Sequence, residues 1–207
     1  NIQSFGFRGE ALPSLGAVGK LKIMSRCLQS DGAELEVDGG KLSSVRPVAM
    51  QPGTRVTLSD LFYATPARLK FLRSDRAESK AIADMMRRLA IAEPSITFCL
   101  RDMATERVVL QVQAEQGNMF DALRSRLGQV MGSAFVENSI AVDAEREEIR
   151  LTGFAGLPTY SRGAAVSQFL FVNGRPVRDK LLLGGLRGAY SDFLSRDRHP
   201  AVALFVE

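Results

Sequence analysis

The chain has 207 residues, of which 45% are hydrophobic and 24% are charged, and its formal net charge is +4. This composition is typical of a packed globular protein and excludes a disordered chain, and no apolar run approaches the roughly 18 residues of a membrane-spanning helix. No signal-peptide pattern opens the sequence, and Cys27 and Cys99 match no metal or redox spacing, which favours a reduced, cytoplasmic protein.

The charge is unevenly distributed along the chain. Residues 65–90 and residues 160–200 each contain seven basic and three acidic residues, whereas residues 137–148 contain five acidic residues and one arginine. Such blocks fit either local positive surfaces or ordinary solvated faces. The chain begins with Asn1 and not with methionine, so we expect a fragment, a processed product or the ordered part of a longer protein.

Near its start the chain carries the run GFRGEAL, from Gly6 to Leu12, in which two glycines flank an arginine. Glycine allows positive φ angles and close approach of the backbone to a ligand. The helix-forming residues that follow predict a helix start, where free N–H groups favour an anion. On these residues alone, the run predicts either a phosphate cradle or an ordinary turn.

The next hundred residues predict strands, one long helix and a hairpin. Alternation over residues 20–23, 35–37 and 55–59 predicts an antiparallel meander with one buried face. Residues 75–93 predict a helix that ends before Pro94, with Ile82, Met85, Met86 and Leu89 on its apolar face. Residues 96–112 predict a hairpin, and the polar segment 113–118 predicts a domain boundary.

After that boundary the pattern starts again. Residues 119–130 predict a helix, residues 139–142 and 149–154 predict strands, and residues 169–172 predict a buried strand that ends in the tight-turn pair Asn173-Gly174. Leu182, Leu186, Tyr190 and Phe193 predict one helix face, and residues 201–206 predict a last strand. The acidic run between Asp143 and Glu148 predicts a solvated hairpin tip, with a cation site as the alternative.

Four segments, taken together, resemble the MutL family of DNA mismatch repair proteins. They are the run from Gly6 to Leu12, the pair Gly53-Thr54, the block LFYATPARLKFL at residues 61–72 and the block FVNGRPVRD at residues 171–179. They stand in that family's order and at its approximate spacings. The two longer blocks separate this pattern from gyrase B and Hsp90, which share a glycine-rich lid.

The resemblance implies a mixed α/β, or α+β, fold. It would comprise part of a gyrase/Hsp90/MutL-type ATPase sandwich, followed by a second domain with a ribosomal-protein-like βαβ fold. We expect residues 1–115 to be the C-terminal part of the ATPase domain, including the ATP lid. Residues 116–207 would be the second domain, truncated at its C-terminus.

The resemblance also assigns nucleotide-binding residues. The lid, whose backbone amides close over the ATP phosphates, corresponds to Gly6, Phe7, Arg8, Gly9, Glu10, Ala11 and Leu12, and Thr54 corresponds to a threonine near the adenine ring. The family's general-base glutamate, its magnesium-binding asparagine and its adenine-binding motif would precede residue 1, and a phosphate-binding lysine would follow Glu207. The intact protein would thus be a weak ATPase that uses ATP and magnesium. We expect this chain alone to bind neither and to be inactive, with no catalytic residue or metal ligand.

In the family, the second domain helps to line a positive groove that holds DNA in the dimer. The resemblance therefore assigns phosphate contacts, without sequence specificity, to Arg162, Arg175, Arg178, Lys180 and Arg187. An ordinary structural role is the alternative for each. The implied partners are DNA, a mismatch-recognition protein, a nicking endonuclease, a helicase and a second copy of the chain.

The implied function is an ATP-gated dimeric switch that couples mismatch recognition to downstream nicking and unwinding, in the cytoplasm and associated with the nucleoid. Two other interpretations stay open. One is a topoisomerase-type subunit of the same ATPase superfamily, and the other is a nucleic-acid-binding module with no nucleotide role.

Overall fold

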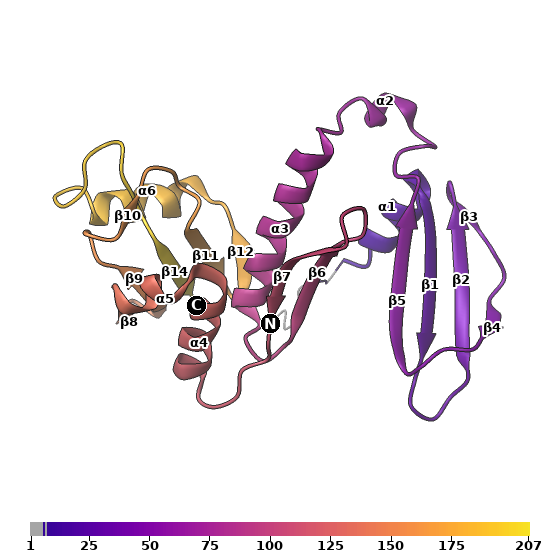
Figure 1. The fold of residues 1–207 in the computed structure, drawn as a ribbon, viewed down its shortest axis with the longest axis horizontal. Helices are drawn as coiled ribbons and strands as arrows, with labels where there is room; N and C mark the ends of the chain where they lie inside the picture. Colours follow the sequence, from indigo (N-terminus) through magenta and orange to yellow (C-terminus); the bar gives the residue numbers. More distant parts are fainter. Residues whose placement is uncertain (1–5, 7) are drawn as a thin grey trace. The chain divides into compact units, whose positions relative to one another are not determined.

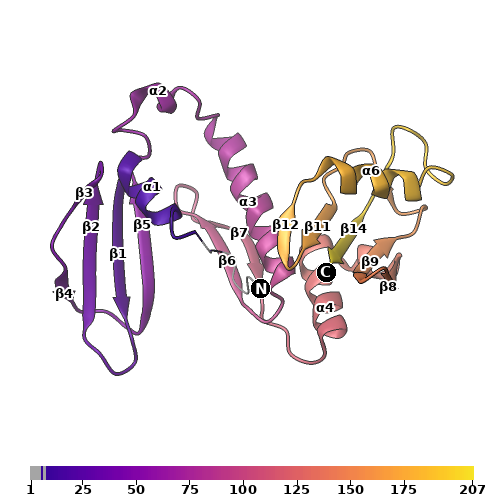
Figure 2. The same cartoon turned by 180° about the vertical axis from the view of Figure 1, so that it is seen from behind.

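The computed structural model describes residue 6 and residues 8–207, which form two compact units, residues 1–75 and residues 76–207. Figures 1 and 2 show the two units from opposite sides, with the first in indigo to violet and the second in magenta to yellow. Each unit is described by itself below. Phe7, which the sequence assigns to the lid, lies outside the described residues.

The first unit is an antiparallel sheet with two short helices. Its elements are α1 (Ala11–Val18), β1 (Lys20–Arg26), β2 (Gly32–Asp38), β3 (Lys41–Leu42), β4 (Arg46–Val48), β5 (Gly53–Ser59) and α2 (Pro66–Leu69). The strand order is β3-β2-β1-β5, and β4 also pairs with β2. The antiparallel sheet predicted for residues 20–59 is confirmed, although β5 pairs with β1 and not with the strand before it.

The two faces of this sheet differ in chemistry because side chains alternate along each strand. On one face, Lys22 contacts Glu34 at 2.9 Å and Glu36 at 3.1 Å, and Arg46 contacts the same two carboxylates. On the other face, Leu21 lies opposite Val37 and Leu58 in the neighbouring strands. Helix α1 packs on this apolar face, since a Cβ added at its buried Gly16 would lie 2.8 Å from a Val37 methyl group.

The second unit begins with a long helix and a hairpin. Its elements are α3 (Asp75–Ala92), β6 (Phe98–Asp102), β7 (Arg107–Val112), α4 (Met119–Met131), α5 (Ser133–Glu137), β8 (Ser139–Arg146), β9 (Ile149–Gly156), β10 (Ser161–Arg162), β11 (Gln168–Val172), β12 (Arg175–Val177), α6 (Lys180–Ala189), β13 (His199–Pro200) and β14 (Val202–Val206). The predicted helices over residues 75–93 and 119–130 and the hairpin over residues 96–112 are confirmed. The five-stranded sheet has the order β12-β11-β14-β9-β8.

A parallel strand pair defines the βαβ unit of this sheet. Strands β11 and β14 are parallel, with Leu170 opposite Leu204, and the chain between them contains β12 and α6. Asn173 and Gly174, with φ angles of 47° and 74°, form the tight turn between β11 and β12, as the sequence predicted. The mixed α+β class and the βαβ unit are thus as expected.

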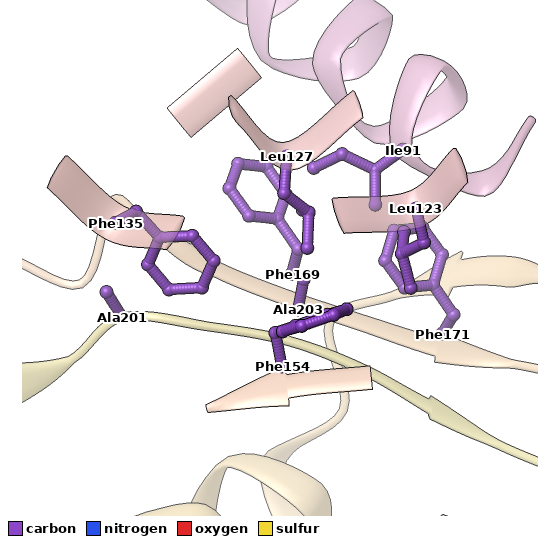
Figure 3. Packing of buried hydrophobic residues seen from close by; sticks show 9 residues of the cluster. All are labelled: Ile91, Leu123, Leu127, Phe135, Phe154, Phe169, Phe171, Ala201 and Ala203. Atoms are coloured by element: carbon purple, nitrogen blue, oxygen red, sulfur yellow. The ribbon is translucent and has the colours of Figure 1, made fainter. Parts of the chain in front are cut away.

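The central strands of this sheet are buried on both faces. One face packs against α3, α4 and α5 through a core in which Phe169, Phe171 and Ala203 of the strands meet Ile91 and Leu127 of the helices (Figure 3). The other face packs against α6 through a second cluster, which consists of Leu170, Leu186, Val202 and Leu204. Neighbouring residues of β11 and β14 point to opposite faces, which explains why these strands are almost wholly apolar.

Two details of the predicted helices are wrong. Ile82 and Met85 of α3 are each 52% exposed. The buried residues of this helix are instead Ala83, Arg88, Ala90 and Ile91. Helix α6 ends at Ala189, so Phe193 lies beyond the helix and is exposed. Apolar periodicity located both helices but did not fix which residues face the core.

The compact units divide at residue 75, and not near residue 115 where the sequence suggests a boundary. Helix α3 and the β6–β7 hairpin pack with the second sheet, partly through Val130 of α4, which contacts the cluster of Ala90, Leu110 and Val112. The functional boundary near residue 115 stays a prediction. Among the described residues, no helix is both long and apolar enough to cross a membrane.

Candidate nucleotide and nucleic-acid sites

The predicted lid forms the start of α1. Gly9 has a φ of +67°, a conformation that favours glycine, and Glu10 occupies the position before the helix. The first helical hydrogen bond joins the Ser14 N–H to the Glu10 carbonyl at 3.1 Å. The N–H groups of Ala11 and Leu12 precede that bond, so they are available to an anion at the positive end of the helix.

An open hollow of about 560 Å³ lies at this helix start. It is lined by Gly6, Arg8, Gly9, Glu10, Ala11, Leu12 and Ser14, and therefore by every described residue of the predicted lid. A Cβ added at Gly6 or Gly9 would meet nothing within 4 Å, so the glycines leave open space around the backbone. This arrangement can accept a phosphate through backbone amides and one guanidinium group.

Thr54, the other predicted nucleotide residue, lies at the start of β5. Thr54 pairs with Ser25 of the neighbouring strand β1, and the two side-chain hydroxyls are 2.9 Å apart. It lies on the apolar face of the first sheet, where Val56, two residues further, is 49% exposed. The side-chain hydrogen bond of Thr54 thus connects it to β1.

The block at residues 61–72 connects β5 to α3 and contains α2. Tyr63 anchors it to the first sheet, because its hydroxyl donates to Asp38 and its ring lies 5.3 Å from the Lys20 ammonium. The hydrogen bond to Asp38, with burial and the Asp38 charge, raises the pKa of Tyr63. Phe71, in contrast, is 83% exposed, so only part of the block packs on its own unit.

The five predicted DNA-binding residues do not form one cluster of equivalent cations. Arg178 forms an ion pair with Asp84 of α3, which also accepts from Arg88 Nε at 3.0 Å. Burial of Asp84 opposes its charge, but the hydrogen bonds and charges of Arg88 and Arg178 outweigh burial and lower the pKa of Asp84. Arg178 therefore joins α3 to the β12–α6 connection and is at least partly neutralised.

The other four basic residues lie on three different elements of the second unit, namely β10, β12 and α6. Arg175 is half-buried in β12, and Lys180 is exposed at the start of α6, where Asp179 caps the helix. Arg187 is in the last turn of α6 and donates to the Arg196 carbonyl at 3.0 Å. Arg162 lies in β10 and stacks on the Tyr160 ring at 4.3 Å.

Sequence reasoning missed Arg126, which is the largest fully buried side chain of the described residues. Its guanidinium donates to the carbonyls of Ala90, Glu93, Pro94, Ile96 and Gln113, at distances from 2.5 to 3.3 Å. Burial lowers the pKa of this group. Because Leu123 and Leu127 share its helix face, the apolar periodicity of α4 could have indicated that Arg126 is buried.

The remaining candidates have structural roles or none. The acidic run forms the tip of the β8–β9 hairpin, where Glu147 and Glu148 have positive φ angles and Asp143 pairs with Arg150 at 2.9 Å. His199 pairs with Arg162 in a two-stranded ladder, and Cys27 and Cys99 are free thiols. No group of three potential metal ligands occurs within residue 6 and residues 8–207.

The fold is that of an ATPase-type domain such as MutL proteins contain. The structure is similar to the MutL ATPase domain of Aquifex aeolicus complexed with ADP, with a TM-score of 0.73 and 29% identity over 96% of this chain and 71% of that one. It also shares its fold with the B-subunit of DNA gyrase from Myxococcus xanthus, with a TM-score of 0.52 and 14% identity over 93% of this chain and 58% of that one.

Sequence comparisons narrow this class to one family. Residues 127–207 match the family model described as the C-terminal domain of DNA mismatch repair proteins. The whole chain is 52% identical to the DNA mismatch repair protein MutL of Chelativorans sp. (strain BNC1). The chain belongs to the MutL family, and it spans 33% of the length of that relative.

Proposed function

We propose that the chain is the nucleotide-responsive part of a DNA mismatch repair protein, in which closure of the Gly6–Leu12 lid over ATP controls dimerisation and the retention of DNA. The observation that carries this proposal is the hollow at the start of α1, which is lined by all the described lid residues. The phosphate oxygens of a bound nucleotide would accept hydrogen bonds from the N–H groups of Ala11 and Leu12 and from the Arg8 guanidinium.

The comparisons support the nucleotide part of this proposal. The similar Aquifex aeolicus domain binds ADP, and this chain aligns with it over 96% of its own length. The adenine is assigned to the neighbourhood of Thr54 by family resemblance. The described residues offer no cluster of carboxylates or histidines for magnesium, so no step is assigned to the metal within this chain.

The DNA part of the proposal depends on the second unit. Arg162, Arg175, Arg178, Lys180 and Arg187 are proposed to contact phosphates, which would make binding independent of sequence and weaker at high salt. Residues 1–115 would respond to nucleotide and residues 116–207 would transmit that response. The proposed partners are a mismatch-recognition protein, a nicking endonuclease and a helicase, and the proposed location is the nucleoid.

The test uses the full open reading frame that contains this chain and a Gly9→Val variant. Valine at a φ of +67° is strained by about 1–3 kcal/mol, which corresponds to roughly 5- to 150-fold in affinity if the lid must keep this shape to bind. We expect the wild type to bind a non-hydrolysable ATP analogue and to dimerise with it in sedimentation velocity, and the variant to do both more weakly.

The matched control is Gly163→Val, at an exposed glycine of the second unit with open space around it. This control should bind the analogue like the wild type. If the wild type and Gly9→Val bind the analogue with equal affinity, the lid does not bind the nucleotide as proposed. If the wild type binds the analogue but does not dimerise, nucleotide does not control dimerisation.

A further inference from the structure

A second hollow, of about 380 Å³, lies beside the last turn of α6. Three arginines line it: Arg187 comes from α6, and Arg196 and Arg198 come from the segment before β13. Gly184 and Gly188 also line it, and a Cβ added at either would meet nothing within 4 Å. The hollow thus combines three guanidinium groups with open space between them.

Neutral oxygen atoms hold two of these arginines in place. Arg187 Nη2 donates to the Arg196 carbonyl at 3.0 Å, and Arg198 donates to the hydroxyl and the carbonyl of Ser161 at 2.9 and 2.7 Å. No described carboxylate forms an ion pair with any of the three arginines of the hollow. Arg187 and Arg198 are therefore held in place without an ion pair, in contrast to Arg178, which is paired with Asp84. The carboxylate of Asp197 offsets part of the charge of Arg198.

The carboxylates of the same segment interact with their own neighbours. Asp192 accepts a hydrogen bond from Ser191 at 3.4 Å, and Asp197 accepts one from Ser195 at 2.6 Å. Arg162 of β10 is a fourth cation near this hollow. It pairs with His199 of β13, which directly follows Arg198 in the chain. The local balance of four arginines against two aspartates leaves this end of α6 positive.

We propose that the hollow formed by Arg187, Arg196 and Arg198 binds a phosphate group of a nucleic-acid backbone. The planar guanidinium group presents paired donors that match phosphate oxygens, and a preorganised arginine loses less freedom on binding. The inference rests on the DNA part of the proposed function. It moves the main DNA contact from the Arg178 end of α6 to the Arg187 end and adds Arg196 and Arg198.

The test measures binding of the 207-residue protein to a 30-base-pair duplex by fluorescence anisotropy between 50 and 200 mM salt. Variant R196E reverses a charge whose side chain makes no hydrogen bond or ion pair with the described residues, so it should fold normally. The double variant R196A/R198A removes the proposed phosphate contact. One lost phosphate contact lowers the slope of log K against log salt by about 0.9, so the double variant should lose about 3.5-fold less affinity than the wild type between 50 and 200 mM salt.

Variant R146E is the matched control, since it makes the same charge reversal at Arg146, which is 89% exposed at the end of β8. We expect R146E to keep the wild-type salt slope and R196E to bind the duplex several-fold more weakly than R146E. Circular dichroism on all variants confirms the fold. Equal affinities and slopes for R196E, R196A/R198A and wild type would overturn the inference while the proposed DNA function stands.

A second arm separates nucleic acid from free phosphate by using tripolyphosphate at constant ionic strength. The proposal is supported if tripolyphosphate displaces the duplex from the wild type but not from R196A/R198A, and if this variant also has the lowered salt slope for duplex binding. If tripolyphosphate binds at this site but the wild type binds no duplex, the nucleic-acid source is wrong. In that case the DNA part of the proposed function fails as well.

Discussion

Replacing Arg126 by methionine should destabilise the second unit strongly, because this side chain satisfies the carbonyls at the end of α3. The Ala90 carbonyl would ordinarily accept from residue 94, but Pro94 has no N–H group, and Arg126 Nη1 donates to that carbonyl at 2.5 Å. Arg126 Nη2 donates to the Ile96 carbonyl at 2.6 Å. Methionine preserves most of the apolar volume but donates nothing.

The magnitude follows from which carbonyls keep a donor. Glu93, Pro94 and Gln113 each have a second donor, namely the N–H groups of Ile96 and Glu115 and the side-chain amide of Gln129. The carbonyls of Ala90 and Ile96 have no second donor among the described groups, and each buried unpaired carbonyl costs about 1–3 kcal/mol. Because methionine also removes the cost of burying a charge, we expect a total loss of about 3 kcal/mol.

Amide hydrogen exchange, read by mass spectrometry on peptides from β6, β7 and α4, measures this loss without requiring the two units to unfold together. Arg124→Met is the control, since Arg124 lies on the same helix and is exposed. A loss of about 3 kcal/mol corresponds to roughly a hundredfold faster exchange. Exchange rates for Arg126→Met within about twofold of those for Arg124→Met would refute the reasoning.

Two further changes should affect the stability of the second unit. Gly153→Ala places a Cβ 2.1 Å from the Ala203 carbonyl at a φ of +127°, so urea unfolding should show a loss of about 2–5 kcal/mol, whereas Gly163→Ala should change it by less than about 0.5. Asp84→Asn should cost about 1–2 kcal/mol at pH 7, a value reduced for solvent screening. The folded pKa of Asp84 lies below 3.8, so this stabilisation is present above that pH and is lost as the pH falls through the folded pKa. The gap between wild type and Asp84→Asn should therefore close in acid, and a gap independent of pH would exclude this ion pair as its cause.

Local sequence patterns predicted most helices, strands and turns, because the start and end of such elements depend mainly on residues that are close in the chain. The pair Asn173-Gly174 specified its turn, and Pro94 specified the end of α3. The burial of α3 was predicted wrongly at Ile82 and Met85, since which side of a helix faces the core depends on the elements packed against it.

Long-range pairing explains what the sequence left undetermined at the candidate sites. The lid run could be recognised as a unit because its residues are consecutive. Arg178, however, pairs with Asp84, which is 94 residues away, and no local pattern reveals that its charge is compensated. Arg196 and Arg198 gain significance through the hollow that they share with Arg187, which depends on how the α6–β13 segment folds back.

Hydrogen exchange at the lid tests the central claim most directly. The measurement compares the backbone amides of residues 8–12 and of Ser14 in the full open reading frame, with and without a non-hydrolysable ATP analogue and magnesium. If these amides bind the nucleotide phosphates, the amides of Gly9, Ala11 and Leu12 should exchange at least about tenfold more slowly with the analogue, and the Gly9→Val variant should lose most of this protection. Saturating binding of the analogue with unchanged exchange at these amides would contradict the account.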